Sequence, residues 1–168
     1  SRLLYGLINN ALVDADDDRQ DYLKALIDMT DSFDGQGGLR TDVVMHIYFL
    51  RDPPTAVSAL LDLVNGRKTD VGNPSSLQTK ALAADLLGRI GRAVGTEAKD
   101  NMLESGVIEA LVEFLKEESN NERPAPRESA AVYALTELAQ DHPPTAQRLA
   151  RLGVVGPPYR YWRKRNLE

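Results

Sequence analysis

Two histidines are the residues of this sequence best suited to acid–base chemistry or metal binding. His46 and His142 lie far apart in the chain, which contains no cysteine. A zinc site draws nitrogen, thiolate and carboxylate ligands from close spacing, and neither histidine has such a set nearby, which argues against a metal site. We interpret His46, in an apolar stretch, as a partly buried side chain with satisfied hydrogen bonds. His142 precedes Pro143 at an expected helix end, where an imidazole favours the negative end of the helix dipole.

Two further stretches have compositions that occur in ion or phosphate sites. Four aspartates resemble the start of a calcium-binding loop: Asp14, Asp16, Asp17 and Asp18. The glycine and glutamate that such a loop needs at its sixth and twelfth positions are missing, so we interpret the aspartates as solvated and helix-capping residues. Glycines at positions 35, 37 and 38 follow no strand pattern and precede no Lys-Ser/Thr pair, which argues against a phosphate-binding loop.

Serine side chains are the remaining candidates for nucleophilic chemistry. Serines at positions 58, 75, 76, 105, 119 and 129 have no histidine close in sequence. A nucleophilic serine needs a base within hydrogen-bonding reach. The sequence therefore predicts no enzyme and no cofactor, with a hydrolase assembled in space as the minor alternative.

The C-terminal stretch 157–165 combines basic and aromatic residues more strongly than any other part of the chain. Its sequence, PPYRYWRKR, contains four basic residues, two tyrosines and the only tryptophan. One interpretation is a patch for nucleic acid or anionic lipid, formed by Arg160, Tyr161, Trp162, Arg163, Lys164 and Arg165. The other is a truncated helix that begins at the prolines and packs its aromatic side chains on the preceding unit. We favour the second because the remainder of the chain is acidic.

The overall composition narrows the class of protein. The 168 residues include 25 acidic and 20 basic side chains, a formal charge of −5, which argues against a general nucleic-acid binder. No apolar run approaches the roughly 18 residues that span a bilayer, so a membrane protein is not expected. The absence of cysteine fits a reducing compartment, and we expect a cytoplasmic or nuclear protein. A helical pattern that stops at 166, and residues 167–168 that resemble a vector scar, predict a fragment of a longer protein.

The spacing of the apolar residues predicts a series of helices. Over 107–118 they recur at the three- and four-residue intervals of a buried helix face: Val107, Ile108, Leu111, Val112, Phe114 and Leu115. The pair Ser105–Gly106 before this stretch predicts a tight corner, because glycine adopts positive φ without steric penalty. Prolines at 124 and 126 separate it from a helix at about 127–140, whose alanines allow close helix approach.

Groups of three helices recur along the sequence. Residues 57–64 align with 108–115, 83–91 with 131–139, and 97–106 with 144–153, while 2–13, 20–33 and 41–51 fit the remaining helices. Repeats of this size cannot close a core alone and stack on their neighbours. We therefore predict one domain over 1–166, made of a partial unit 1–36, unit 37–94, unit 95–142 and a partial unit 143–166.

The order of a short helix, a glycine corner, an amphipathic helix and an alanine-rich helix resembles the armadillo repeat. The resemblance is strongest over 97–153, which contains SGVIEALVEFL and AAVYALTELAQ, and it covers about 130 residues. It implies an all-α fold: an armadillo-type helical repeat superhelix (α-solenoid) of about three units with truncated ends. HEAT repeats, which have two helices per unit, are the alternative.

The resemblance also implies a groove built from the third helices, along which an extended peptide lies. Importin-like members clamp a basic peptide with a tryptophan and an asparagine on that helix, but Tyr133 and Glu137 stand at those positions here. The other two units place Lys24 and Asp85 at the first position, and Asp28 and Arg89 at the second. Catenin-like grooves are basic, whereas these six residues have mixed charge and select no ligand.

These expectations define a non-enzymatic scaffold that binds a protein or peptide partner and no small-molecule substrate. A chaperone-associated role is the alternative, because small armadillo domains that resemble this one in size bind a heat-shock chaperone and promote nucleotide exchange. A lipid or nucleic-acid tether through 157–165 is the third hypothesis.

Overall fold

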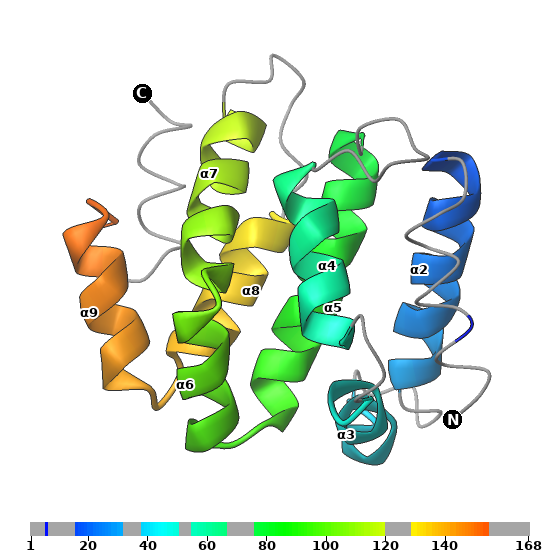
Figure 1. The fold of residues 1–168 in the computed structure, drawn as a ribbon, viewed down its shortest axis with the longest axis horizontal. Coiled ribbons are helices and arrows are strands. Elements are labelled where there is room, and N and C mark those ends of the chain that lie inside the picture. Colours follow the sequence, from blue (N-terminus) through cyan, green and yellow to red (C-terminus); the bar gives the residue numbers. More distant parts are fainter. Residues whose placement is uncertain are drawn as a thin grey trace.

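The computed structural model describes residue 6 and residues 16–31, 38–50, 55–66, 76–119 and 129–154. These residues form eight helices, shown in Figure 1: α2 (Asp16–Thr30), α3 (Thr41–Tyr48), α4 (Ala56–Asn65), α5 (Leu77–Ala93), α6 (Thr96–Glu104), α7 (Val107–Ser119), α8 (Ala130–Ala139) and α9 (Pro143–Arg151). The predicted all-α class is confirmed for this part of the chain, where an isolated antiparallel bridge joins Asp31 to Leu39. None of the described helices is long and apolar enough to cross a membrane.

Hydroxyl side chains begin three of the helices and account for small differences from the predicted bounds. Ser76 Oγ accepts a hydrogen bond from Thr79 N at 3.2 Å, and Ser129 Oγ accepts one from Val132 N at 3.3 Å. Thr55 caps α4 in the same way. Each cap satisfies one N–H group that the first helical turn leaves unpaired, a contribution of about 1 kcal/mol. Two serines considered above as nucleophiles therefore serve as helix caps.

Glycines with positive φ follow three of the helices. Gly66 after α4 has φ 64°, Gly106 after α6 has φ 89°, and Gly153 after α9 has φ 82°. This region of backbone space is open to glycine but costly for most other residues. The corner predicted at Gly106 is confirmed, and Gly153 occupies the corresponding place after the helix that aligns with α6.

The helices pack around α5, which contacts α2, α4 and α8. α4 packs on α5 and contacts α7, while α7 packs on α8. In the view of Figure 1, α4 and α7 lie in front of α5 and α8, with α2 and α9 at opposite ends. Along the chain, α3 contacts α4 and α4 contacts α5, and in the same order α6 contacts α7 and α7 contacts α8.

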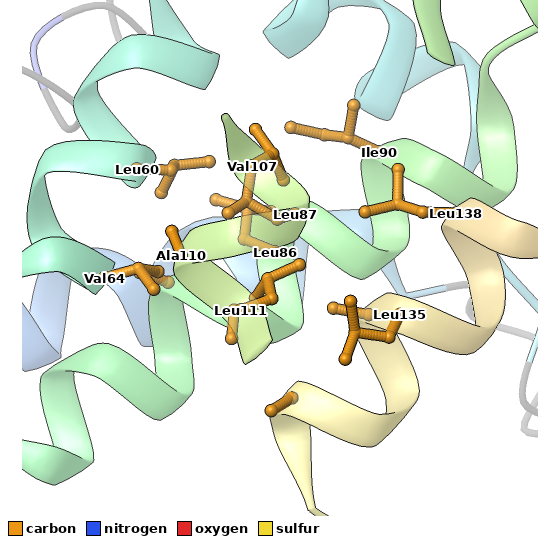
Figure 2. Packing of buried hydrophobic residues seen from close by; sticks show 14 of the residues in the cluster. Leu60, Val64, Leu86, Leu87, Ile90, Val107, Ala110, Leu111, Leu135 and Leu138 are labelled. Carbon is orange, nitrogen blue, oxygen red and sulfur yellow. The ribbon is translucent and has the colours of Figure 1, made fainter. Parts of the chain in front are cut away.

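One apolar core runs through these helices. Figure 2 shows side chains from α4, α5, α7 and α8 meeting in it, among them Leu60, Leu87, Leu111 and Leu135. Leu87, Leu111 and Leu135 are each 0% exposed. Removing a leucine side chain fully from water contributes about 1.5–3 kcal/mol, so this core dominates the stability of the fold.

Two glycines of α5 allow α8 to approach closely. A Cβ atom at Gly88 would lie 2.6 Å from Cε1 of Tyr133 and 2.9 Å from Cα of Ala134. A Cβ atom at Gly91 would lie 2.9 Å from Cδ2 of Leu138. Carbon atoms that are not bonded prefer separations of about 3.5–4.0 Å, so larger residues at these positions would push the two helices apart.

Candidate functional site

The six groove residues predicted from the sequence lie on three helices, of which α5 contacts the other two. They are Lys24 and Asp28 on α2, Asp85 and Arg89 on α5, and Tyr133 and Glu137 on α8. The two residues on α2 are exposed, and the four on α5 and α8 are half-buried.

Arg89 connects α5 to the C-terminal end of α2. Its Nε donates a hydrogen bond to Oδ1 of Asp85 at 3.0 Å, and its Nη1 donates one to Oγ1 of Thr30 at 2.9 Å. The same Nη1 forms an ion pair with Asp31, the residue after α2. Burial lowers the pKa of Arg89, but the hydrogen bonds and charges of Asp31 and Asp85 outweigh this effect and raise the pKa above its usual value. The guanidinium is therefore held as a cation between two carboxylates.

A hollow of about 350 Å³ opens beside this arginine, and we call it the polar hollow. It is lined by Asp31, Gly38, Leu39, Asp85, Arg89, Arg92, Ser129, Ala130 and Tyr133. The segment that contains Leu39 is held beside α2, because Arg40 N donates to Thr30 O at 2.7 Å. The lining includes two arginines and two aspartates, so its formal charge is balanced.

Tyr133 forms one wall of the polar hollow and also packs on α5. Its Cε1 and Cδ1 atoms lie 2.6 Å and 2.7 Å from the place that a Cβ atom at Gly88 would occupy. Burial raises the pKa of the Tyr133 hydroxyl, and the negative charge of Glu137 raises it further. The hydroxyl is therefore protonated at neutral pH and can both donate and accept a hydrogen bond.

The polar hollow differs in membership from the predicted groove. Lys24, Asp28 and Glu137 are not among its lining residues, whereas Asp31 and Arg92 are. Arg92 follows Arg89 at the three-residue spacing that places side chains on one helix face, so its position beside Arg89 could have been predicted from the sequence. Asp31 had no such signal, because it lies beyond the end of α2 and meets Arg89 only through the packing of α2 on α5.

His142 lies buried at the corner between α8 and α9, with 1% of its surface exposed. Its Nε2 is 2.7 Å from Oδ1 of Asp100 on α6, and its Nδ1 is 2.6 Å from Oγ1 of Thr145. A neutral imidazole satisfies both contacts when Nε2–H donates to Asp100 and the Thr145 hydroxyl donates to Nδ1. Because Thr145 is also 1% exposed, a substrate has no access to the imidazole, although Asp100 is exposed, and we assign His142 a structural role.

The contact with a negative helix end that we expected of His142 is made by Lys99. Its Nζ donates hydrogen bonds to the carbonyl oxygens of Glu137 at 3.1 Å and Gln140 at 2.7 Å, at the C-terminal end of α8. Burial lowers the pKa of Lys99, and the charges of Asp141 and Glu137 partly offset this effect. Lys99 thereby satisfies carbonyl groups that the last helical turn leaves unpaired.

The predicted partial burial of His46 is wrong, because this histidine is exposed. It lies on α3 opposite the buried residues Val44 and Ile47, and its Nδ1–H donates to Asp42 O at 2.7 Å. The apolar composition of α3 concealed the fact that only one of its faces enters the core.

Other candidates from the sequence fall into three groups. Asp16, Asp17 and Asp18 begin α2, and the exposed side chain of Asp18 places negative charge near the helix N-terminus, where it complements the helix dipole. Asp14 and the basic-aromatic residues 160–165 lie outside the described residues. Within the described ranges, no group of three or more histidine and carboxylate side chains could hold a metal ion.

The chemistry that the polar hollow offers is hydrogen bonding and charge pairing. Arg89, Arg92 and Tyr133 provide donors, and Asp31 and Asp85 provide acceptors. Such groups can bind the backbone and polar side chains of a peptide. No family model, curated protein or solved structure matches the chain, so the assignment of a function rests on this geometry.

Proposed function

We propose that the chain is a non-enzymatic protein-binding module of armadillo-type helical repeats, and that its polar hollow binds a peptide segment of a protein partner. Support for the repeat comes from the successive contacts of α3 with α4 and α4 with α5, which recur in α6 with α7 and α7 with α8. Ser76 and Ser129 cap α5 and α8, the third helices of two successive units, in the same way. Glycines with positive φ follow α6 and α9, the first helices of two successive units.

One observation carries the binding proposal: Asp85, Arg89 and Tyr133 line the same hollow. These residues were chosen from sequence alone, as equivalent positions in two units. Their meeting in one concave, polar site is what a shared binding surface requires.

The internal contacts of the polar hollow prepare it for a ligand. Arg89 is held by Asp31 and Asp85, so a partner that contacts it causes little further loss of side-chain entropy. Tyr133 offers a large aromatic surface and a hydroxyl group, a combination that is common at binding hot spots. Arg92 is exposed in the last turn of α5 and can pair with a carboxylate of the partner.

Affinity capture from a cell extract tests this function, with Arg92→Glu compared with Arg151→Glu. Both arginines are exposed and lie in the last turn of a helix, so both changes place the same unfavourable charge near a helix C-terminus. Only Arg92 lines the polar hollow. We expect Arg92→Glu to weaken capture of a specific partner by about tenfold or more, while Arg151→Glu retains it. Equal retention by both variants, with unchanged helical circular dichroism, would contradict the proposal.

The chaperone-associated role and the tether stay predictions. The tether depends on 157–165, which lie outside the described residues. A non-enzymatic role agrees with the positions of Ser76 and Ser129 as helix caps and with the burial of His142.

A further inference from the structure

A second concave surface lies between α3, α4 and α6, and we call it the apolar groove. Its volume is about 770 Å³, and it shares no lining residue with the polar hollow. The large apolar side chains that line it include Met45, Phe49, Val57, Leu61 and Met102. Pockets of roughly 300–1,000 Å³ bury most of the surface of a ligand, so the apolar groove can receive several side chains of a partner.

Phe49 identifies this groove as an interaction surface. It keeps 53% of its surface exposed and packs edge-to-face with the Tyr48 ring, with ring centroids 5.2 Å apart. Leu152, 37% exposed, is the other exposed large hydrophobic residue in the described part of the chain, and it lies outside the groove. An exposed aromatic residue beside a set of apolar side chains is typical of a binding hot spot.

The helices around the apolar groove are acidic. α3, α4 and α6 together carry five carboxylates and one lysine: Asp42, Asp62, Glu97, Asp100, Glu104 and Lys99. The ammonium of Lys99 offers no surface charge here, because it is bound to carbonyl oxygens of α8. Arg40, just before α3, pairs with Asp42 at 3.2 Å. On α6, by contrast, Glu97 and Glu104 are exposed, and Glu97 lines the groove itself.

The combination of an apolar floor and an acidic wall limits the kinds of partner that fit. A segment that enters an apolar groove needs partners for its own backbone N–H and C=O groups, and a helix provides them internally. Basic side chains at the edges of its apolar face would meet Glu97, which lines the groove. We propose that the apolar groove binds one amphipathic helix of a partner protein, with large apolar residues toward Phe49 and Leu61 and lysine or arginine residues toward α6.

The test measures binding of a fluorescein-labelled leucine–lysine peptide of about 14 residues, with leucines on one helical face, by fluorescence anisotropy. A second peptide replaces every lysine with glutamate and keeps the leucines. We expect the leucine–lysine peptide to bind and the leucine–glutamate peptide to bind at least about tenfold more weakly, because its charge repels α6.

Two pairs of variants locate the binding site of the leucine–lysine peptide. Phe49→Ala should weaken binding about tenfold, and Leu152→Ala, an exposed apolar truncation elsewhere, should leave it unchanged. Glu97→Lys should weaken binding, and Asp21→Lys, the same charge change at an exposed position of α2, should have no specific effect. All four positions are exposed, so circular dichroism should show the same helical content in each variant.

Three results would overturn the proposal. Equal binding to Phe49→Ala and Leu152→Ala would place the peptide elsewhere. Equal binding of both peptides would show that the groove takes any apolar ligand and has no preference for a basic helix. A concentration-dependent dimer in analytical ultracentrifugation that Phe49→Ala abolishes would show that a second copy of the chain occupies the groove.

Discussion

The polar hollow and the apolar groove are two concave surfaces of the same helical framework, and they differ in how their side chains are held. In the polar hollow, Arg89 is bound by Asp31, Thr30 and Asp85, so its charge is fixed before any ligand arrives. In the apolar groove, Phe49 has no such bonds and leaves more than half of its surface in contact with water.

This difference shows that the chemistry of a concave surface depends on the side chains that its helices present, in addition to the way the helices pack. In the polar hollow, a partner is selected by the geometry of hydrogen bonds and charges, because a mismatched group leaves a polar atom unpaired. In the apolar groove, affinity comes mainly from covering apolar area, and the acidic wall restricts the charge of the partner.

The largest expected effect comes from Leu135→Ala, which would weaken the core that supports the polar hollow. Leu135 on α8 is 0% exposed and lies among the core side chains shown in Figure 2. Its truncation should lower the free energy of unfolding by about 2–5 kcal/mol, because apolar contacts are lost and a cavity remains. Urea denaturation followed by circular dichroism measures this loss. Leu152→Ala, at a position 37% exposed, should change it by less than about 0.5 kcal/mol, and similar losses in both variants would contradict the assigned core.

Gly88→Ala should affect binding at the polar hollow but not at the apolar groove, and it should destabilise the fold less than Leu135→Ala. The added methyl group would lie 2.6 Å from the Tyr133 ring and 2.9 Å from the backbone of α8. Overpacking costs about 1–3 kcal/mol, and the higher helix propensity of alanine returns up to about 1 kcal/mol, so we expect a net loss of roughly 1 kcal/mol in the free energy of unfolding. The shift of Tyr133 should also weaken partner capture by the polar hollow and leave peptide binding in the apolar groove unchanged.

Gly95→Ala provides the control for that experiment. A Cβ atom at Gly95 would have no heavy atom within 4 Å, and its φ of −84° suits any residue. Gly95 lines the apolar groove but not the polar hollow, so partner capture by the polar hollow should stay at the wild-type level. If Gly88→Ala were instead more stable than the wild type and captured the partner normally, close contact between α5 and Tyr133 would not shape the polar hollow.

Glu118→Gln should have a small, pH-dependent effect beside the start of α8, where Ser129, which lines the polar hollow, is a hydrogen-bond partner of Glu118. Burial raises the pKa of Glu118, and hydrogen bonds from Ser129 and the backbone of Ala131 partly oppose this effect. A raised pKa in the folded protein means that the ionised carboxylate weakens the fold at neutral pH. The substitution should therefore increase the free energy of unfolding at pH 7, by less than about 1 kcal/mol.

The gain should disappear as the pH falls below the ordinary glutamate value of 4.5, because Glu118 is then protonated in both the folded and the unfolded chain. Denaturation at a series of pH values measures it. Glu104→Gln, at an exposed position of α6, is the matched control and should show no comparable gain at pH 7. A gain that persisted unchanged in acid would mean that the effect does not arise from the charge of Glu118.

The helices could be predicted from the sequence because their signals are local. The apolar spacing over 107–118 matches α7, and the corner at Gly106 follows from the conformational freedom of glycine. The same reasoning was wrong for His46, since an apolar composition shows that a helix is buried but not which of its polar residues faces outward.

The sites could be predicted only in part because they join residues that are distant in sequence. The pairing of Asp85 with Arg89 could be predicted, because the two residues are four positions apart on one helix face. The ion pair of Arg89 with Asp31 could not, because it joins two helices and depends on their packing. The contact of His142 with Asp100 arises in the same way. The apolar groove gave no periodic signal at all, because α3, α4 and α6 each contribute only a few of its side chains.

The most direct test of the account is hydrogen exchange of the chain alone and in complex with the partner that affinity capture isolates. If the polar hollow binds this partner, exchange should slow in the segments that line it, residues 38–40 after α2 and the first turn of α8 at 130–133, and should be unchanged in α9. Protection confined to α9, or to α6 and the apolar groove, would contradict the assignment of the polar hollow as the partner-binding site.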